Sequence, residues 1–287
     1  MNLSIQIPAW TPKIRKLQYD CNYFHFIRYA GLNNMNISLT YPDTKEVWAP
    51  RNGTWMSMTV NGKQLVVDFS DKWEEGLKRF DEYEKYIKIQ YNIGHDCSQF
   101  KRLFPSMPAL DIRNYDHLMT FWDMVQQGNF YLANGDTILS CQRAHTRALE
   151  RRTNVQALLK KTYKYYADIE LTNQLTMWNK HKDCLVAVVV PGAQNHMIDR
   201  QHLEQIALGV CTIAPSLDTV LCYWKKLENG IHFIQCKDDY SDLLEKIEWC
   251  RNHREECRII GQNARQFFLD FCAPKPYWKW LQSIVEG

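Results

Sequence analysis

Apolar and polar stretches alternate most regularly in the last third of the chain. An apolar run at residues 184–190 leads into a polar loop, and then into the pattern of a capped helix at residues 199–209. A second apolar stretch at residues 232–236 precedes an amphipathic pattern over residues 242–249. This order predicts strand, loop, helix, strand and helix, which is how an α/β domain places a ligand beyond the carboxyl ends of its strands.

The same alternation starts further upstream. Residues 137–140 predict a strand, residues 146–166 a long basic helix, and residues 168–182 a connection to the apolar run. The strand expected after the capped helix occupies residues 210–215. Strands that alternate with helices imply a parallel sheet with right-handed crossovers.

The first half has a less regular pattern, which ends at a break near residues 127–136. Residues 60–63 predict a hairpin turn into a short strand at residues 64–68. Residues 74–91 predict a helix with charges on one side and apolar residues on the other. Prolines predict a loop at residues 104–109.

Composition narrows the class of protein. The chain has 287 residues, a net charge of +3 and a pI near 8.2, and its length allows about two domains. The charge is too mild to argue for nucleic acid, which draws domains of pI above about 9. No apolar run approaches the roughly 18 residues that span a bilayer, and the ten cysteines form no C-x-x-C pair. We therefore expect a cytoplasmic protein with reduced cysteines, no membrane span and no nucleic-acid partner.

Several catalytic motifs are missing from the sequence. It contains no G-x-G-x-x-G, Walker loop, H-E-x-x-H or G-x-S-x-G. No D-x-D occurs either, which is the motif that metal-dependent sugar transferases use to hold a nucleotide diphosphate. If the chain moves a sugar from a nucleotide donor, side chains and helix N-termini must neutralise the diphosphate in place of Mg²⁺. We therefore expect no metal and no other cofactor.

A basic stretch supplies the first candidates for that task. Arg143 lies at the expected turn from strand to helix, and Arg147 and Arg151 lie four residues apart on one helix face. Arginines grip a diphosphate bidentately, which suits such a cluster. The alternative is a solvated basic helix face with Glu150 as a local partner.

The capped helix supplies further candidates. Arg200 directly follows Asp199, the expected N-cap, and the first backbone amides of that helix point toward the strand ends. Glu204 lies one turn further and could accept hydrogen bonds from ribose hydroxyls. A solvent-facing helix glutamate is an equally good interpretation of Glu204.

These stretches resemble, in order, motifs of the protein O-glucosyltransferase and fungal capsule xylosyltransferase family. The counterparts are residues 66–73 for a strand ending in a D-W-P-like turn, 141–144 for G-S-R-T, 200–209 for an arginine-bearing helix ending in glycine, 232–236 for H-Y-I/V-P-V, and 240–244 for D-L-x-D-L. Residues 68–71 and 86–91 are also similar to small transferases of large DNA viruses that build capsid glycans, including xylosyltransferases. A viral protein of this kind would act in the host cytoplasm.

The resemblance implies a GT-B fold, in which two Rossmann-like domains face a cleft and the C-terminal helix crosses back to the first domain. We expect an acceptor-binding domain at residues 1–135 and a nucleotide-sugar-binding domain at residues 136–270. A helix is expected at residues 255–272, and the two prolines that follow it, at 274 and 276, end it. A last helix is expected at residues 277–285. Residues 271–287 are thus the segment that would pack on the first domain.

The resemblance also implies a general base. Asp71 matches the acidic residue of the D-W-P-like turn, which in the family deprotonates the acceptor hydroxyl. Lys72 and Trp73 replace the Trp-Pro of that motif, and Asp68 is a nearby rival, with His25 a weaker one. We place Asp68 and Trp73 on the acceptor side. A loop or helix-capping aspartate is the alternative for Asp71.

Donor-binding roles follow in the same way. The resemblance assigns diphosphate and sugar contacts to Arg143, Arg200 and His232, with Arg147, Arg151, Gly192 and Glu204 as further candidates. The glycine and threonine of G-S-R-T are Cys141 and Ala144 here. The sequence thus predicts an inverting, metal-independent transferase that moves xylose or glucose from a UDP-sugar to a glycan hydroxyl. The alternative is a noncatalytic glycan- or nucleotide-binding α/β protein.

Overall fold

The computed structural model covers most of the second half of the chain and parts of the first. The described residues are 2–6, 36–40, 55–68, 85–92, 103–108, 110, 112, 115–142, 149–192 and 195–287. The chain forms two compact units. Unit 1 comprises Met1–Arg113, Thr219–Lys225 and Phe271–Gly287, and unit 2 comprises Asn114–Asp218 and Lys226–Asp270. The expected domain boundaries stay a prediction, although residues 114–135 group with unit 2 and residues 271–287 with unit 1.

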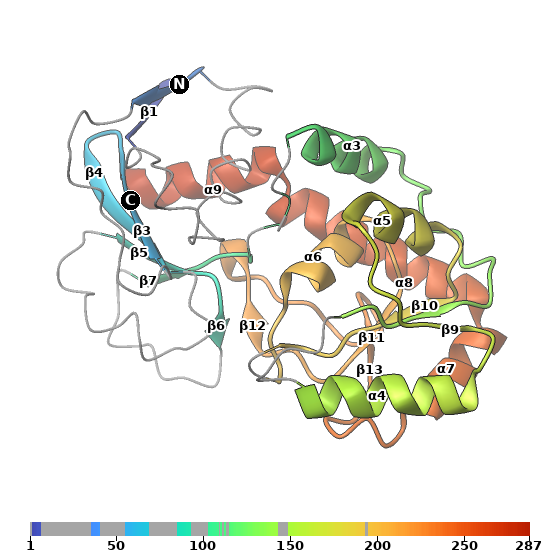
Figure 1. The fold of residues 1–287 in the computed structure, drawn as a ribbon. Coiled ribbons are helices and arrows are strands. Elements are labelled where there is room, and N and C mark those ends of the chain that lie inside the picture. Colours follow the sequence, from blue (N-terminus) through green and yellow to red (C-terminus); the bar gives the residue numbers. More distant parts are fainter. Residues whose placement is uncertain are drawn as a thin grey trace. The chain divides into compact units, whose positions relative to one another are not determined.

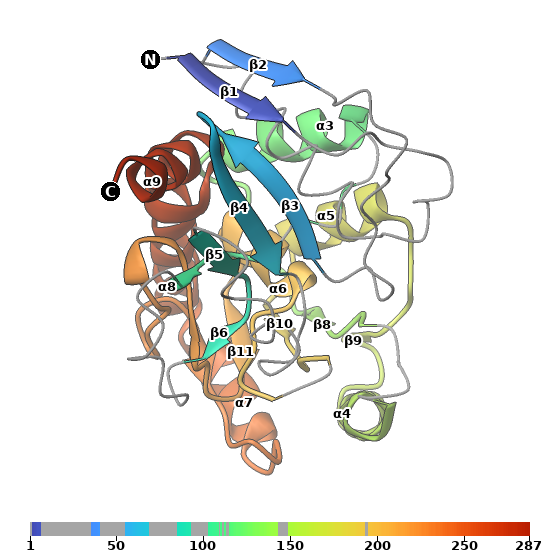
Figure 2. The ribbon, with the colours of Figure 1, turned by 90° about the vertical axis from the view of Figure 1, so that its left-hand side faces the viewer.

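Six of the described strands of unit 1 form a mixed sheet in the order β2-β1-β3-β4-β5-β7. They are β1 (Asn2–Gln6), β2 (Asn36–Thr40), β3 (Trp55–Val60), β4 (Lys63–Asp68), β5 (Lys85–Lys88) and β7 (Leu103–Pro105). Figure 2 shows β3 and β4 as the hairpin predicted around residues 60–63. Asn61 and Gly62 both have positive φ, 49° and 80°, as the two-residue turn between twisted strands requires.

Two predictions for the first half are wrong where the structure describes them. Residues 85–92 form β5 and β6 (Tyr91–Asn92) instead of the end of a helix. Tyr86, Ile87 and Lys88 are buried in succession, so both faces of β5 are covered and the two-residue alternation of a half-buried strand is absent. Part of the stretch expected to be a loop pairs with β5 as β7, where Pro105 is tolerated because β7 is an edge strand.

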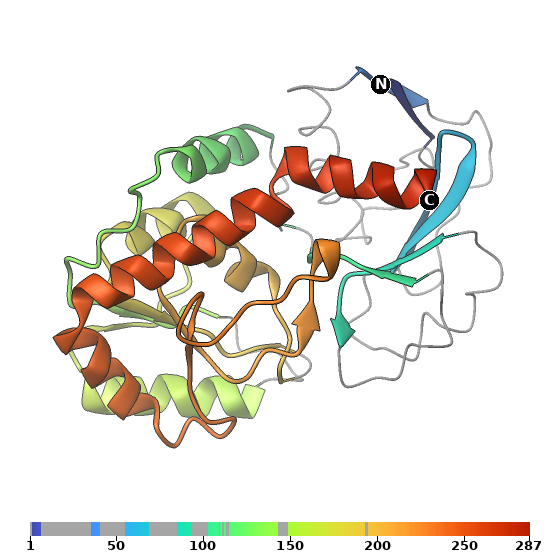
Figure 3. The same ribbon diagram turned by 180° about the vertical axis from the view of Figure 1, so that it is seen from behind.

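Later segments of the chain complete unit 1. β12 (Thr219–Val220) pairs antiparallel with β6, and a short 3₁₀ turn, η3 (Cys222–Trp224), follows it. The last helix, α9 (Pro274–Glu286), confirms the expected C-terminal helix (Figure 3). It buries Trp278 and Trp280. Pro274 stands in its first turn, where a missing N–H costs no helical hydrogen bond.

Unit 2 contains the parallel sheet that the alternation of strands and helices predicted. Its strand order is β13-β11-β10-β8-β9, and each described neighbouring pair is parallel. The strands are β8 (Ile138–Leu139), β9 (Ala167–Asp168), β10 (Val186–Val188), β11 (Thr212–Ala214) and β13 (Ile234–Gln235). Residues 184–190 are fully buried. Their continuous apolar run reflects a central strand covered on both faces.

Helices cover both faces of this sheet. The predicted helices are present as α4 (Leu149–Thr162), α6 (Arg200–Ala207), α7 (Leu243–Asn252) and α8 (Arg254–Phe267), the last continuing into a π-helical turn, η4 (Phe268–Cys272). Figure 1 and Figure 2 agree in placing α4 on one side of the sheet and α5 and α6 on the other. The chain is therefore an α/β protein with a parallel sheet.

Two helices of unit 2 were not predicted. α3 (Tyr115–Gln126) precedes the sheet, and α5 (Gln174–Lys182) lies in the stretch expected to be a plain connection. α5 is short, with Met177, Trp178 and His181 as its buried residues. So few apolar positions leave little helical periodicity to detect. Its N-cap is Asn173, whose Oδ1 accepts the Thr176 N–H at 2.9 Å.

Candidate functional site

The order of strands in unit 2 changes direction between β8 and β10. These strands are parallel neighbours, yet the connection from β8 through α4 leads to β9 on one side, and the connection from β10 through α6 leads to β11 on the other. Open α/β sheets bind ligands at such a switch point, outside the carboxyl ends of the strands. The segments that follow these two strands, residues 140–142 and 189–192, are therefore the candidate site.

Two glutamines fix the segment after β8. Gln142 Nε2 donates to the Val188 carbonyl of β10 at 3.0 Å. From α4, Gln156 Nε2 donates to the carbonyls of Ser140 and Gln142 at 2.9 and 3.0 Å. Gln142 and Ser140 are buried. The backbone at the end of β8 is thus held by both its neighbouring strand and the helix that follows it.

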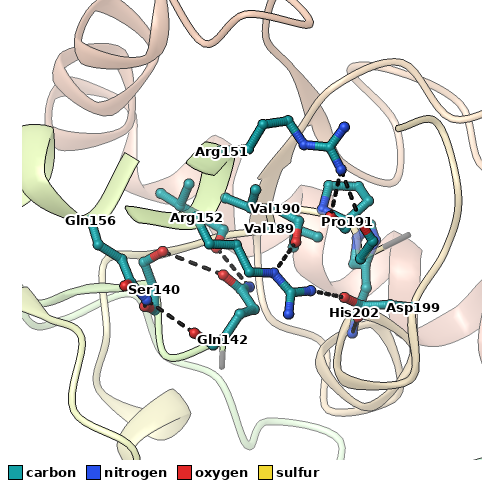
Figure 4. A network of polar contacts seen from close by, with 12 residues as sticks. Ser140, Gln142, Arg151, Arg152, Gln156, Val189, Val190, Pro191, Asp199 and His202 are labelled. Carbon is teal, nitrogen blue, oxygen red and sulfur yellow. Dashed lines mark hydrogen bonds and ion pairs between the residues drawn. The ribbon is translucent and has the colours of Figure 1, made fainter. Parts of the chain in front are cut away.

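Arg151 reaches from α4 to the segment after β10. Its Nη2 donates to the carbonyls of Pro191 and Gly192, each at 3.0 Å (Figure 4). Its Nε is buried and has no hydrogen-bond partner among the described residues. An unsatisfied buried donor on a cation costs free energy that an anionic ligand can recover. Arg151 therefore combines a fixed position with spare capacity for an anion.

Arg152 lies beside it and is more deeply buried. Its Nε donates to the Val190 carbonyl at 2.9 Å, and its Nη2 lies 3.2 Å from Asp199 Oδ2 (Figure 4). Burial lowers the pKa of the Arg152 guanidinium, and the Asp199 carboxylate opposes that shift. The same aspartate accepts the His202 N–H through Oδ1 at 2.9 Å, which confirms Asp199 as the N-cap of α6.

Arg200 is the first residue of α6 and is half-buried. The N-terminus of a helix carries a partial positive charge and unpaired N–H groups, so it favours an anion. Of the predicted donor-binding residues, the structure brings Arg151 and Gly192 into direct contact, and Arg200 adjoins their segment through Asp199. An arginine beside a loop and a helix N-terminus is a combination that favours an anionic group.

Glu204 does not join this group. It is buried in α6, where its two carboxylate oxygens accept hydrogen bonds from α5, Oε2 from Trp178 Nε1 at 2.8 Å and Oε1 from Gln174 Nε2 at 3.2 Å. These contacts join two helices on the same face of the sheet. A role in binding ribose stays a prediction that would compete with these bonds.

His232 also lies elsewhere in unit 2. It precedes β13, and because β13 runs parallel to β11, His232 stands at the amino end of the sheet. Its Nδ1 accepts the Glu228 N–H at 3.0 Å, and its ring packs edge-on against Phe267, with centroids 5.0 Å apart. Burial lowers the pKa of His232, and Glu228 opposes that shift. The structure therefore does not bring His232 together with Arg151 and Gly192.

The remaining predicted residues belong to unit 1 or lie outside the described residues. Asp68 ends β4 and is 1% exposed. Its carboxylate accepts the Tyr86 hydroxyl and lies 3.3 Å from Lys88 Nζ, which is equally buried. This pairing makes Asp68 a poor alternative to Asp71 as the general base, because a base must be free to take a proton. The predictions for Asp71, Trp73, Arg143 and Arg147 fall outside the described residues.

Sequence reasoning missed Arg152, although a signal was present. Arg152 stands three and seven residues before Val155 and Leu159, and these three are the buried residues of α4. That spacing places Arg152 on the apolar face of the helix, toward the sheet. An arginine on such a face must be paired internally, since a buried cation without partners is strongly unfavourable.

A second polar group on this edge of the sheet was also missed. His196 Nδ1 lies 2.6 Å from Ser216 Oγ, and its Nε2 lies 3.5 Å from Asp238 Oδ2. His196 has a positive φ of 64°, which is uncommon for a residue with a side chain. These residues follow β10, β11 and β13, so they border the candidate site.

Metal-binding clusters and membrane-spanning helices are absent from the described part of the chain. Within it, no group of three or more His, Cys, Asp or Glu side chains is placed to hold a metal ion. None of its helices has the length and apolar character to cross a membrane. The described cysteines are free and buried, and burial raises the pKa of Cys222 to about 12.

Comparisons with known proteins find short local similarities. The chain is 36% identical over 59 residues to uncharacterized protein 179R of Invertebrate iridescent virus 6, which covers 21% of the chain and 5% of that protein. It is 40% identical over 45 residues to protein O-glucosyltransferase 2 of Danio rerio, which covers 16% of the chain and 9% of that protein. The matches thus span less than a tenth of either relative. No family model matches the chain.

A solved structure extends the likeness to nearly the whole chain. A glycosyltransferase from Rickettsia africae ESF-5 superposes with a TM-score of 0.50 over 97% of this chain and 83% of that one. The identity is 12%, so this likeness concerns the fold. The chain therefore has glycosyltransferase-like relatives over short stretches and a glycosyltransferase as a structural neighbour.

Proposed function

We propose that the chain is an inverting, metal-independent glycosyltransferase of the GT-B kind. It would move xylose or glucose from a UDP-sugar to a hydroxyl group of a glycan acceptor, in the cytoplasm. The observation that carries the proposal is the arginine network at the switch point of unit 2, where Arg151 contacts the loop that follows β10. The reaction class agrees with the names of the O-glucosyltransferase relative and of the structural neighbour.

In this proposal, unit 2 holds the nucleotide. The UDP diphosphate lies beyond the ends of β8 and β10, where Arg151 has a buried Nε without a partner among the described residues. Arg200 and the first turn of α6 supply further positive charge. Arg143 and Arg147, predicted from the sequence, would add to it. Fixed cations and helix N–H groups stabilise the charge that develops on the departing UDP, which is the task of a metal in other transferases.

Unit 1 carries the acceptor side of the proposal. The acceptor hydroxyl attacks the anomeric carbon as the bond from that carbon to the UDP oxygen breaks, and the hydroxyl proton passes to the Asp71 carboxylate. A single in-line displacement inverts the configuration of the sugar. Trp73 would contact the acceptor. The ion pair of Asp68 with Lys88 would hold the end of β4, which precedes Asp71 in the sequence.

A donor assay tests the reaction class. We expect the protein to release UDP from UDP-xylose or UDP-glucose, with the same rate in EDTA as in buffer alone, and to leave GDP-mannose intact. Coupled detection of free UDP and GDP measures all three donors in parallel. Binding of UDP without release of UDP from any donor, with short oligosaccharides present as acceptors, would favour the noncatalytic alternative.

A further inference from the structure

We propose that Arg152 is a positioning residue for the nucleotide site, acting through the segment that connects β10 to α6. This inference rests on the proposed function, because it concerns the residues that would hold UDP. Arg152 itself would touch no ligand. Its task is to fix the loop and the start of α6, so that Gly192 and Arg200 stand where a diphosphate can bind.

The contacts of Arg152 support this task. Its Nε donates a hydrogen bond to the Val190 carbonyl at 2.9 Å, and its Nη2 donates one to Asp199 Oδ2 at 3.2 Å. Val190 lies two residues beyond the end of β10, and Asp199 directly precedes α6. One side chain therefore fixes both ends of the connection between them. Figure 4 shows the guanidinium lying between these two partners.

Asp199 passes this restraint to the helix. One of its oxygens, Oδ2, pairs with Arg152, while the other, Oδ1, accepts the His202 N–H at 2.9 Å. The cap and the ion pair thus share one rigid carboxylate. A shift of Arg152 would turn that carboxylate and disturb the first turn of α6, where Arg200 stands.

The ion pair between Arg152 and Asp199 is largely buried, which strengthens it. The side chains of Arg152 and Asp199 are 10% and 18% exposed, so water screens their charges poorly. Lysine could not replace this arginine, because a single ammonium group cannot reach two partners in the fixed geometry of the guanidinium fork. A methionine would fill the space of the stem and leave Asp199 without its charge partner.

The two neighbouring arginines therefore have different tasks. Arg151 holds the first part of the connection, directly after Val190, through the carbonyls of Pro191 and Gly192, and it retains a donor for a ligand. Arg152 holds the ends of the connection. A change at Arg152 should consequently alter where the nucleotide contacts lie, with the contacting groups themselves still present.

The test compares Arg152→Lys, Arg152→Met and Asp199→Asn with a matched control, Arg254→Met. Arg254 also holds a chain segment of unit 2, through the carbonyls of Ala133 and Gly135 at 3.1 and 2.7 Å and an ion pair with Asp136. That segment precedes β8, at the amino end of the sheet. Asparagine at position 199 can still cap the helix, so Asp199→Asn removes the ion pair alone.

Two measurements are made on each variant. Hydrogen exchange without nucleotide reports the opening of residues 195–203, and calorimetry with UDP reports affinity. We expect faster exchange in that segment and UDP affinity lower by about tenfold in the three site variants, the size of the loss when one charge-assisted hydrogen bond to a phosphate is weakened. The double variant Arg152→Met/Asp199→Asn should lose no more affinity than either single one. Arg254→Met should keep UDP affinity within about twofold of the wild type.

Three results would overturn the inference. The first is wild-type UDP affinity in a folded Arg152→Met protein. The second is an equal loss of affinity in Arg254→Met, which would indicate general destabilisation. The third is unchanged exchange of residues 195–203. If the wild type binds no UDP, the proposed function fails, and the exchange data alone still decide whether Arg152 fixes this segment.

Discussion

Asp71→Asn is expected to slow sugar transfer by about 10²- to 10⁴-fold, the usual contribution of a general base. Asparagine has the shape of aspartate but cannot take the proton of the acceptor hydroxyl. Initial rates of transfer at saturating donor and acceptor measure the effect. The thermal unfolding temperature and the affinity for UDP should stay close to those of the wild type, because the nucleotide contacts of the proposed site belong to unit 2.

Transfer at the wild-type rate by Asp71→Asn would remove this residue from the mechanism. A loss of activity together with a loss of folding would leave the base undecided, so the variant is paired with Asp71→Glu. The glutamate keeps a carboxylate with one more methylene group. We expect it to recover part of the rate, which a purely structural aspartate in a loop would not show.

Asp68→Asn is expected to destabilise the protein by about 3–5 kcal/mol, the cost of breaking a buried ion pair from one side. Asp68 and Lys88 are each 1% exposed and 3.3 Å apart, at paired positions in the parallel strands β4 and β5. Asparagine can still accept the Tyr86 hydroxyl, so the change isolates the charge. Urea unfolding followed by circular dichroism measures the loss.

The double variant Asp68→Asn/Lys88→Met is the control for that experiment. It removes both charges, so no buried charge is left without its partner, and an unpaired buried charge is what makes a one-sided change costly. We expect the double variant to be more stable than Asp68→Asn alone. If Asp68→Asn unfolded at the wild-type urea concentration, the carboxylate and the ammonium would not depend on each other, and Asp68 would again be a candidate for the acceptor side.

Most of the second half of the fold could be predicted because elements such as β10 and α6 carry their own signal, whereas α5 has too few apolar positions to show a helical period. The run at residues 184–190 is apolar throughout since β10 is covered on both faces, and Asp199 marks the start of α6. In β5, burial on both faces made the strand harder to recognise from the sequence. Ile87 and Tyr91 are four residues apart, like positions on one face of a helix, and the buried Lys88 resembles a solvent-facing charge until Asp68, twenty residues earlier, is known to be its partner.

The residues of the candidate site differ in the same way, because some have a local signal in the sequence and others do not. Arg151, Gly192 and Arg200 could be found because loops and helix starts next to strand ends are local features of the sequence. Arg152 depends on Val190 and Asp199, which are distant in the sequence, so only its place on the apolar face of α4 pointed to it. His232 was placed by resemblance, and the direction of β13 puts it at the other end of the sheet.

Calorimetry with UDP in EDTA, on the wild type and on Arg200→Ala, tests the central claim most directly. The account predicts that the wild type binds UDP without a metal and that Arg200→Ala binds at least about tenfold more weakly, the loss of one charge-assisted hydrogen bond to a phosphate. GDP and NADH should bind neither protein. Absence of UDP binding by the folded wild type, or equal binding by Arg200→Ala, would contradict a nucleotide site at the switch point of unit 2.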